Sequence, residues 1–312
     1  MCGIAGIIHR SGESAGIGRE LTDMLQALRH RGPDSAGFAL YGESQPGRLL
    51  LRFKVAESSD MVGGFKMLDE VRERRAEVDQ RIHNLKGKIV TADPVTDYAF
   101  RYELEFDGSV PEIAGYIEEI DQVEILSLGR SLELVKDLGD AQKVSDSYGL
   151  GGFQGSHGIG HARMATESDV DIRSAHPYWA FPFTDVSVVH HGQLTNYWMG
   201  RRALERRGHR FASDCDSELI AVYLADKVDQ GIPLEDAMRQ SIQDIDGVFT
   251  YLVATDRMLG LAKDRLAAKP MVLFESDEVI VLASEEVAIR SVFPQEIETS
   301  DPYEEAVRVW QI

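Results

Sequence analysis

Two spacings of apolar residues organise the first part of the chain. Residues 3–8 form an apolar run with interleaved glycines, which predicts a buried strand whose backbone is closely approached. Between Arg19 and Arg29 the apolar residues recur three and four positions apart, which predicts an amphipathic helix that ends before the turn-rich residues 30–34. Residues 35–41 predict a second strand. The chain therefore begins with a strand, a helix and a strand.

The pattern of charged and apolar residues changes over residues 54–144, which predicts an inserted α/β subdomain. Apolar residues lie on one face of a highly charged segment, 68–85, which predicts an amphipathic helix packed on its own domain. Docking of a partner by the same face is the less favoured alternative. Strand-like segments at 98–106 and 123–128 flank a second helical segment at 111–121.

The C-terminal half continues with both kinds of element. Residues 186–190 and 249–255 alternate as strands, while 196–207 and 217–227 show helical spacing. We expect antiparallel sheets and a single α+β domain over 1–312.

Composition narrows the functional classes. The chain has 312 residues, 43% hydrophobic residues and a formal net charge of -19, with a pI near 4.9. A chain this acidic, without a basic stripe, is not expected to bind nucleic acid. No apolar run has the length of a membrane span, and two cysteines cannot form a disulfide framework, so we expect a cytoplasmic protein without membrane association.

Cys2 is the first candidate for chemistry. Removal of the initiator methionine before a small residue would leave a residue that carries both a thiol and a free α-amine. The two groups have pKa values of about 8.5 and about 8, so the amine can accept the thiol proton without a separate histidine. A cysteine at position 2 is also consistent with chance, and the other motifs decide between the two readings.

Five motifs occur in one order along the chain and together resemble the class II glutamine amidotransferases. They are Met1-Cys2-Gly3-Ile4, residues 30–37 (HRGPDSAG), residues 160–166 (GHARMAT), residues 189–192 (VHHG) and residues 214–218 (DCDSE). The resemblance implies an N-terminal-nucleophile hydrolase fold, a four-layer αββα sandwich in which two antiparallel sheets are stacked between helices. It also implies an enzyme that uses Cys2 to hydrolyse glutamine.

Recognition of glutamine needs one fixed cation and one fixed anion, because the substrate carries an α-carboxylate and an α-ammonium. Arg163 can contact a carboxylate with two parallel hydrogen bonds, and Asp216 can accept from an ammonium. The resemblance assigns these roles to Arg163 and Asp216 and places Thr166 beside the carboxylate. Surface ion pairs are the alternative for each residue taken alone.

Attack on the amide creates an oxyanion that must meet donors already in place. Gly192, at a tight turn after a strand, can offer its backbone N–H. In the family the preceding residue is usually an asparagine that supplies a second donor, but here it is His191. A neutral imidazole still has one N–H, and a protonated one would add charge, so an impaired or partner-gated glutaminase is expected.

The resemblance gives Arg31 a supporting role next to Cys2, although a structural ion pair would explain it nearly as well. Cys215 is interpreted as a small, half-buried side chain in preference to a redox group. The remaining histidines lack metal-ligand spacing, and the glycine run 149–152 lacks the residues of a phosphate loop, so neither a metal nor another cofactor is expected.

The chain is too short to carry an acceptor domain as well, so we expect ammonia to pass to another polypeptide. Looser motifs at 128–134, 158–168 and 307–310 resemble stand-alone amidotransferase subunits related to glutamate synthase, most closely that of N-methylglutamate synthase. The implied partners are a flavin-binding glutamate-synthase-like subunit and a glycine-repeat β-helix subunit.

Two other functions remain open. An N-terminal-nucleophile hydrolase of another amide would not need the pair Arg163 and Asp216. A catalytically weak or inactive pseudo-amidotransferase that binds glutamine or a synthase partner would explain His191. Product assays and a covalent adduct at Cys2 would distinguish these possibilities.

Overall fold

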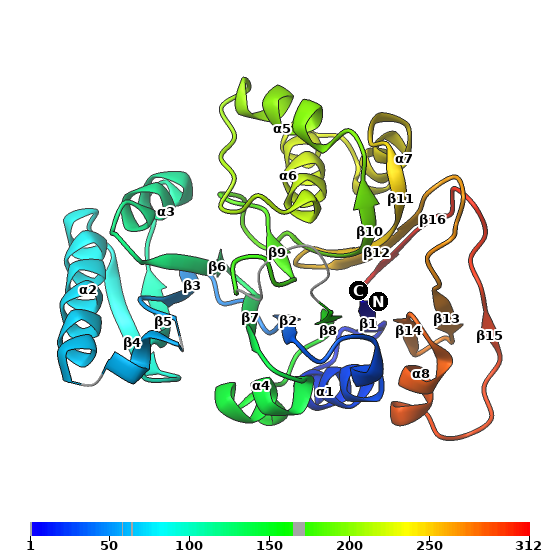
Figure 1. The fold of residues 1–312 in the computed structure, drawn as a ribbon, viewed down its shortest axis with the longest axis horizontal. Coiled ribbons are helices and arrows are strands. Elements are labelled where there is room, and N and C mark those ends of the chain that lie inside the picture. Colours follow the sequence, from blue (N-terminus) through cyan, green and yellow to red (C-terminus); the bar gives the residue numbers. More distant parts are fainter. Residues whose placement is uncertain (1, 58, 64, 165–171) are drawn as a thin grey trace.

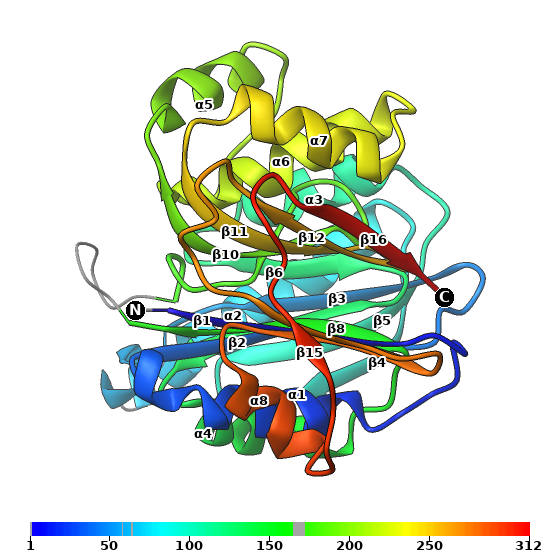
Figure 2. The same ribbon diagram turned by 90° about the vertical axis from the view of Figure 1, so that its right-hand side faces the viewer.

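Two antiparallel sheets lie face to face at the centre of the molecule, and helices cover the outer face of each (Figures 1 and 2). The computed structural model describes residues 2–57, 59–63, 65–164 and 172–312. The four layers are those predicted for an αββα sandwich. β1 begins at one end of the sandwich, beside the ends of β2 and β8 (Figure 2).

The first sheet has seven strands in the order β15-β13-β14-β1-β8-β2-β7. Helices α1, α4 and α8 cover it (Figure 2). The strands are β1 (Gly3–His9), β2 (Ser35–Tyr41), β7 (Leu132–Leu138), β8 (His157–Arg163), β13 (Val272–Glu275), β14 (Val279–Ala283) and β15 (Thr299–Ser300), and the helices are α1 (Ile17–Ala27), α4 (Ala141–Tyr148) and α8 (Glu286–Val292). The glycines of β1 and β8 fit this central position, since neighbouring side chains pack directly over them.

The second sheet has five strands in the order β16-β12-β11-β10-β9 and is covered by α5, α6 and α7. The strands are β9 (Tyr178–Trp179), β10 (Ser187–Leu194), β11 (Gly247–Ala254), β12 (Met258–Lys263) and β16 (Val307–Gln311), and the helices are α5 (Tyr197–Glu205), α6 (Asp216–Asp229) and α7 (Leu234–Asp244). The predicted elements at 186–190, 196–207, 217–227 and 249–255 are therefore present, with boundaries shifted by a few residues.

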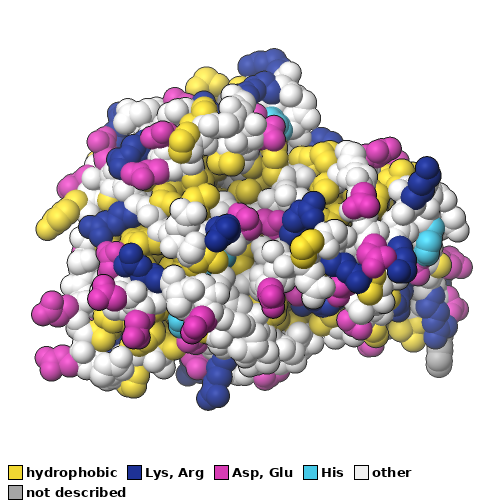
Figure 3. Space-filling model, turned by 180° about the vertical axis from the view of Figure 1, so that it is seen from behind, with side chains coloured by type: hydrophobic (Ala, Val, Ile, Leu, Met, Phe, Trp, Pro, Cys, Tyr) yellow, Lys and Arg dark blue, Asp and Glu magenta, His cyan; other side chains and the backbone are white. Residues whose placement is uncertain are grey.

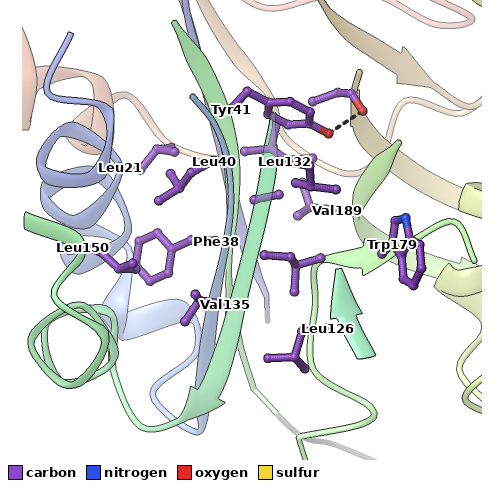
Figure 4. Close-up of a cluster of buried hydrophobic side chains, with 14 of the residues drawn as sticks. Leu21, Phe38, Leu40, Tyr41, Leu126, Leu132, Val135, Leu150, Trp179 and Val189 are labelled. Carbon is purple, nitrogen blue, oxygen red and sulfur yellow. Dashed lines mark hydrogen bonds between the residues drawn. The ribbon is translucent and has the colours of Figure 1, made fainter. Parts of the chain in front are cut away.

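The core fills both sides of the first sheet. Phe38 and Leu40 point from β2 towards the helices, where they lie near Leu21 and Leu150, while Tyr41 points into the space between the sheets (Figure 4). This alternation follows from the period of two in a strand. The Tyr41 hydroxyl reaches Ser187 Oγ of the second sheet at 2.8 Å, so a polar contact also joins the two sheets.

A third sheet, in the order β4-β5-β3-β6, forms a lobe beside the sandwich together with α2 and α3 (Figure 1). Its elements are β3 (Arg48–Lys54), α2 (Phe65–Asn84), β4 (Lys88–Pro94), β5 (Ala99–Glu105), α3 (Val110–Glu118) and β6 (Glu124–Gly129). The predicted limits of 54–144 differ from this sheet at both ends. β3 enters the small sheet at the start, whereas β7 and α4 belong to the sandwich because β7 pairs with β2.

Buried ion pairs join the small sheet to the sandwich. Glu133 of β7 accepts from Arg52 and Arg101 of the small sheet, at 2.7 Å to Nη2 of Arg52 and 2.7 Å to Nε of Arg101. On the same strand, Lys136 lies 3.5 Å from Glu124 of β6. Although burial acts to raise it, Arg52 and Arg101 hold the pKa of Glu133 below its usual value. Charges buried in this way need their partners, so they fix how the small sheet sits on β7.

The described helices include none that is both long and apolar enough to cross a membrane. On the face seen in Figure 3, acidic and basic side chains are interspersed, and no continuous basic stripe crosses the residues drawn there.

Candidate active site

One cleft of about 550 Å³ opens where Cys2, which directly precedes β1, meets the end of β8, the end of β10 and the start of α6. Its walls contain five of the residues predicted from sequence, from widely separated parts of the chain: Cys2, Arg163, His191, Gly192 and Asp216. Thr166 lies outside the described residues. Arg31 does not line the cleft, but its side chain donates a hydrogen bond to the Cys2 carbonyl oxygen.

Cys2 is held at the entrance to β1 by its backbone. Arg31 Nε donates to the Cys2 carbonyl oxygen at 3.0 Å, and the Arg31 side chain is only 6% exposed. The other side of the guanidinium pairs with Glu285, which also lies 2.9 Å from His30 Nε2. The Cys2 Sγ itself is 3.9 Å from the Met164 carbonyl oxygen. The thiol is therefore at the cleft surface, while its main chain is anchored.

The turn after α1 brings Arg31 to this position. A one-turn 3-10 helix, Arg29–Arg31, is followed by Gly32, which passes very close to the end of β8. A Cβ atom on Gly32 would lie 2.3 Å from the Arg163 carbonyl carbon and 2.6 Å from the Ala162 oxygen, so no other residue fits. The glycine of the predicted turn thus has a local steric cause.

Arg163 and Asp216 provide one cation and one anion in the cleft wall. Arg163 ends β8 and is 6% exposed. Asp216 begins α6, and its Oδ2 accepts from the Leu194 N–H at 2.8 Å. Its Oδ1 accepts from Ser217 Oγ at 3.2 Å. The carboxylate is therefore oriented by β10 and α6, and its side chain is still 22% exposed to the cleft.

Gly192 lies within β10, not at the tight turn expected after the strand, and its φ of +153° favours glycine. A Cβ atom there would lie 2.2 Å from the Val248 carbonyl oxygen of the paired strand β11. Alternate N–H groups of an extended strand point to the same edge, and the Leu194 N–H is directed at Asp216. Two residues earlier, Gly192 directs its N–H towards that edge, away from β11, where it can donate to a bound group.

His191 is neutral in this environment. Its side chain is 5% exposed, and burial, together with the positive charges of Lys269 and Arg31, lowers its pKa to about 3. The sequence left open whether the His191 imidazole is neutral or protonated, and this environment disfavours the protonated form. A neutral imidazole has one N–H donor, so His191 has one hydrogen to offer in the cleft.

Sequence reasoning missed a group of buried histidines around the cleft. His176 and His190 line it, and the His161 ring lies 4.0 Å from that of His176 between ring centroids. Burial lowers the pKa of all three. His190 forms part of the motif at 189–192, so the adjacent pair of histidines was the available signal. Within the described ranges, no group of three or more His, Cys, Asp or Glu side chains is arranged to hold a metal ion.

Cys215 is a free thiol at the start of α6 and also lines the cleft. Burial and the neighbouring Asp216 raise the pKa of the Cys215 thiol, and its Sγ lies 3.8 Å from Asp216 Oδ1. A raised pKa makes the thiolate scarce, which agrees with a packing role for this side chain.

Comparison with known proteins identifies the family. The chain is 41% identical over 317 residues to a protein of Methanothermobacter thermautotrophicus that carries a provisional glutamine amidotransferase name, and the match covers all of both chains. The chain belongs to the glutamine amidotransferase family. A family model described as a glutamine amidotransferase domain matches residues 161–291. The glutamine amidotransferase-like protein GlxB of Rhizobium meliloti is 32% identical, over all of this chain and 95% of its own.

Solved amidotransferases share the fold. Glutamine phosphoribosylpyrophosphate amidotransferase from B. subtilis superposes with a TM-score of 0.61 at 16% identity. The match covers 99% of this amidotransferase chain but only 47% of that structure, so the chain spans about half the length of the solved enzyme. The similarity confirms the predicted sandwich of the N-terminal-nucleophile hydrolase class.

Proposed function

We propose that this amidotransferase is a glutaminase subunit that hydrolyses glutamine through a thioester at Cys2 and delivers ammonia to a separate synthase subunit. The observation that carries the proposal is the shared cleft: a thiol, a cation, an anion and a strand N–H, from positions 2, 163, 216 and 192, line one space of about 550 Å³. The four groups are far apart in sequence and meet only in the folded chain. Each can supply a different function that glutamine hydrolysis requires.

The chemistry follows from these groups. After removal of Met1, the free amine of Cys2 takes the thiol proton, and the thiolate attacks the side-chain amide carbon of glutamine. The oxyanion that forms is met by the Gly192 N–H and by the N–H of neutral His191. The carbon–nitrogen bond breaks, the amine returns the proton to the leaving nitrogen, and ammonia departs. Water then hydrolyses the thioester and releases glutamate and the free thiol.

Substrate recognition uses the charged pair. Arg163 binds the α-carboxylate, and Asp216 accepts from the α-ammonium. The family resemblance, and not the described structure, assigns Thr166 to the carboxylate as well. The position of Asp216 at the first turn of α6 supports this role, because the helix holds the carboxylate in one orientation. Arg31 contributes by anchoring the Cys2 main chain.

We assign the ammonia to an enzyme of the N-methylglutamate synthase type. The looser sequence motifs at 128–134, 158–168 and 307–310 support this assignment. The partners would be a flavin-binding glutamate-synthase-like subunit and a glycine-repeat β-helix subunit. Copurification of these two subunits from a host that encodes all three tests the assignment.

Intact mass and glutaminase activity, measured on one preparation, test the core of the proposal. The mature protein should begin at Cys2, release ammonia from glutamine faster than from asparagine or acyl amides, and lose turnover in Cys2→Ala. A diazo-ketone analogue of glutamine should add to Cys2 in the parent and not in Cys2→Ala. Full turnover by Cys2→Ala would overturn the mechanism, and faster cleavage of an acyl amide would overturn the substrate.

His191 gives the pseudo-amidotransferase its only specific support, because it stands where the family usually has asparagine. The same experiment separates the two functions. A pseudo-amidotransferase would bind glutamine without turnover, and its Cys2 would not form the adduct even in the presence of the synthase subunits.

A further inference from the structure

His190 occupies an unusual place between two parts of the cleft. It lies on β10 two residues before Gly192, so both face the same side of the strand. The imidazole is 2% exposed, and its Nδ1 lies 2.7 Å from Ser217 Oγ. Its Nε2 has no hydrogen-bond partner in the part of the chain that the structure describes.

One edge of the ring rests against the glycine of the proposed oxyanion site. An ideal Cβ atom at Gly192 would lie 2.9 Å from His190 Nε2, so the ring fills the space that a side chain at position 192 would take. The extended backbone of Gly192, with φ at +153°, is thus bounded by β11 on one side and by this imidazole on the other. A smaller group at position 190 would leave the backbone of Gly192 without this support.

The opposite edge of the ring leads to the proposed ammonium site. Ser217 Oγ donates to Asp216 Oδ1 at 3.2 Å, because a carboxylate can only accept. A hydroxyl has one hydrogen, so Ser217 must then accept from Nδ1–H of His190. Nδ1–H, Oγ–H and Oδ1 form a directed chain, and His190 is a neutral imidazole with its proton on Nδ1. Burial agrees with this state, since it lowers the His190 pKa although Asp216 acts to raise it.

We infer that His190 is a positioning residue that joins the two halves of the glutamine site, and this inference rests on the proposed function. Through Ser217 it fixes the Asp216 oxygen that accepts from the substrate ammonium. Through its Nε2 edge it holds Gly192 in the conformation that offers the N–H to the oxyanion. One side chain therefore ties substrate binding to transition-state stabilisation without contacting the reacting atoms itself.

Two substitutions separate these links. Ser217→Ala breaks the link between His190 and Asp216 but leaves the imidazole ring beside Gly192. It should raise KM for glutamine by about tenfold, the worth of a hydrogen bond to a charged group, with kcat within about threefold of the parent. His190→Asn keeps an amide N–H near the position of Nδ1. Because asparagine is shorter than histidine, this variant has no atom in the place of Nε2, next to Gly192. It should leave KM near the parent value and lower kcat by about tenfold. Ser217→Thr, which retains the hydroxyl, should restore KM.

An analogue provides the second readout. 4-Carbamoylbutanoate has the amide and a carboxylate of glutamine but no α-ammonium, so Ser217→Ala should not change its KM. His157→Asn is the matched control, because His157 is also buried and neutral but bonds Thr255 away from the cleft. It should lower the unfolding temperature while both kinetic constants for glutamine stay at the parent values.

The outcomes distinguish the inference from the proposed function. If Ser217→Ala raises KM equally for both amides, or if His190→Asn raises KM as Ser217→Ala does, the positioning role is wrong and glutaminase activity stands. If the parent protein neither binds nor hydrolyses glutamine, the proposed function fails and this inference fails with it.

Discussion

The buried histidines predict that acid destabilises the protein in a defined pH window. Burial lowers the pKa of His157 from 6.5 to about 4, and burial with nearby positive charges lowers that of His191 to about 3. Each is neutral in the folded chain, whereas in the unfolded chain each takes up a proton below about pH 6.5. Unfolding therefore binds protons, and the free energy of unfolding falls as the pH is lowered through this range.

The size of this loss of stability depends on how far the pH lies below the pKa of histidine in the unfolded chain. At about pH 5, which is about 1.5 pH units below that value, each of the two histidines lowers the free energy of unfolding by about 2 kcal/mol, because one pH unit is worth about 1.4 kcal/mol per proton. His161 and His176 act in the same direction, since burial holds both pKa values well below 6.5. Glu118 acts in the opposite direction, because burial raises its pKa to about 7.

A single substitution isolates one histidine from the others. Urea unfolding of the parent and of His157→Gln, followed by fluorescence at about pH 7.5 and about pH 5, gives the loss of free energy for each protein. His157→Gln should lose about 2 kcal/mol less than the parent between the two pH values, whatever its stability at the higher one. Equal losses in the two proteins would show that His157 is not kept neutral by burial.

Three further predictions concern the active site. His191→Asn should raise kcat for glutamine at least about tenfold, because the imidazole donates from a different position than an asparagine amide and one oxyanion donor is worth about a hundred- to a thousandfold. An unchanged kcat would contradict the impaired donation expected of His191. Gly192→Ala should lower the unfolding temperature and stop turnover, because its Cβ would lie 2.2 Å from the Val248 oxygen, and an active, stable variant would refute this. Arg31→Ala should lower kcat about ten- to a hundredfold in steady-state assays through loss of the bond to Cys2, and a rise in KM alone would show that Arg31 acts on the substrate.

Local patterns predicted most elements of the sandwich because their periodicity is present within each segment. β1, β2, α1 and α6 are read from apolar spacing alone, and their ends agree with the structure to within a few residues. The limits of the small sheet were not predictable in this way. Residues 132–138 have the same strand-like texture as residues 123–128, and only long-range pairing with β2 assigns them to the sandwich.

The site shows the same division between local and tertiary information. The motifs named Cys2, Arg163, Gly192 and Asp216, and the fold brings all four into one cleft. Some of the residues that hold these four in place do not belong to any recognisable sequence motif. Glu285, which pairs with Arg31 across 254 positions of sequence, carries no local signal of this role. Contacts of this kind depend on the folded geometry, which the spacing of residues along the chain does not contain.

The register between β2 and β7 has a consequence for the lobe that they enclose. Tyr41 at the end of β2 is paired directly with Leu132 at the start of β7, so the chain leaves the sandwich and returns to it at adjacent points. The whole lobe is thus an enlarged hairpin connection, and a short turn could close the same two strands. Glu133 and Lys136, freed of their ionic partners, would then regain water. Because none of the residues that line the cleft of Cys2, Arg163 and Asp216 belongs to the lobe, a protein shortened in this way would retain that cleft. Any property lost on shortening would then be a property of the lobe.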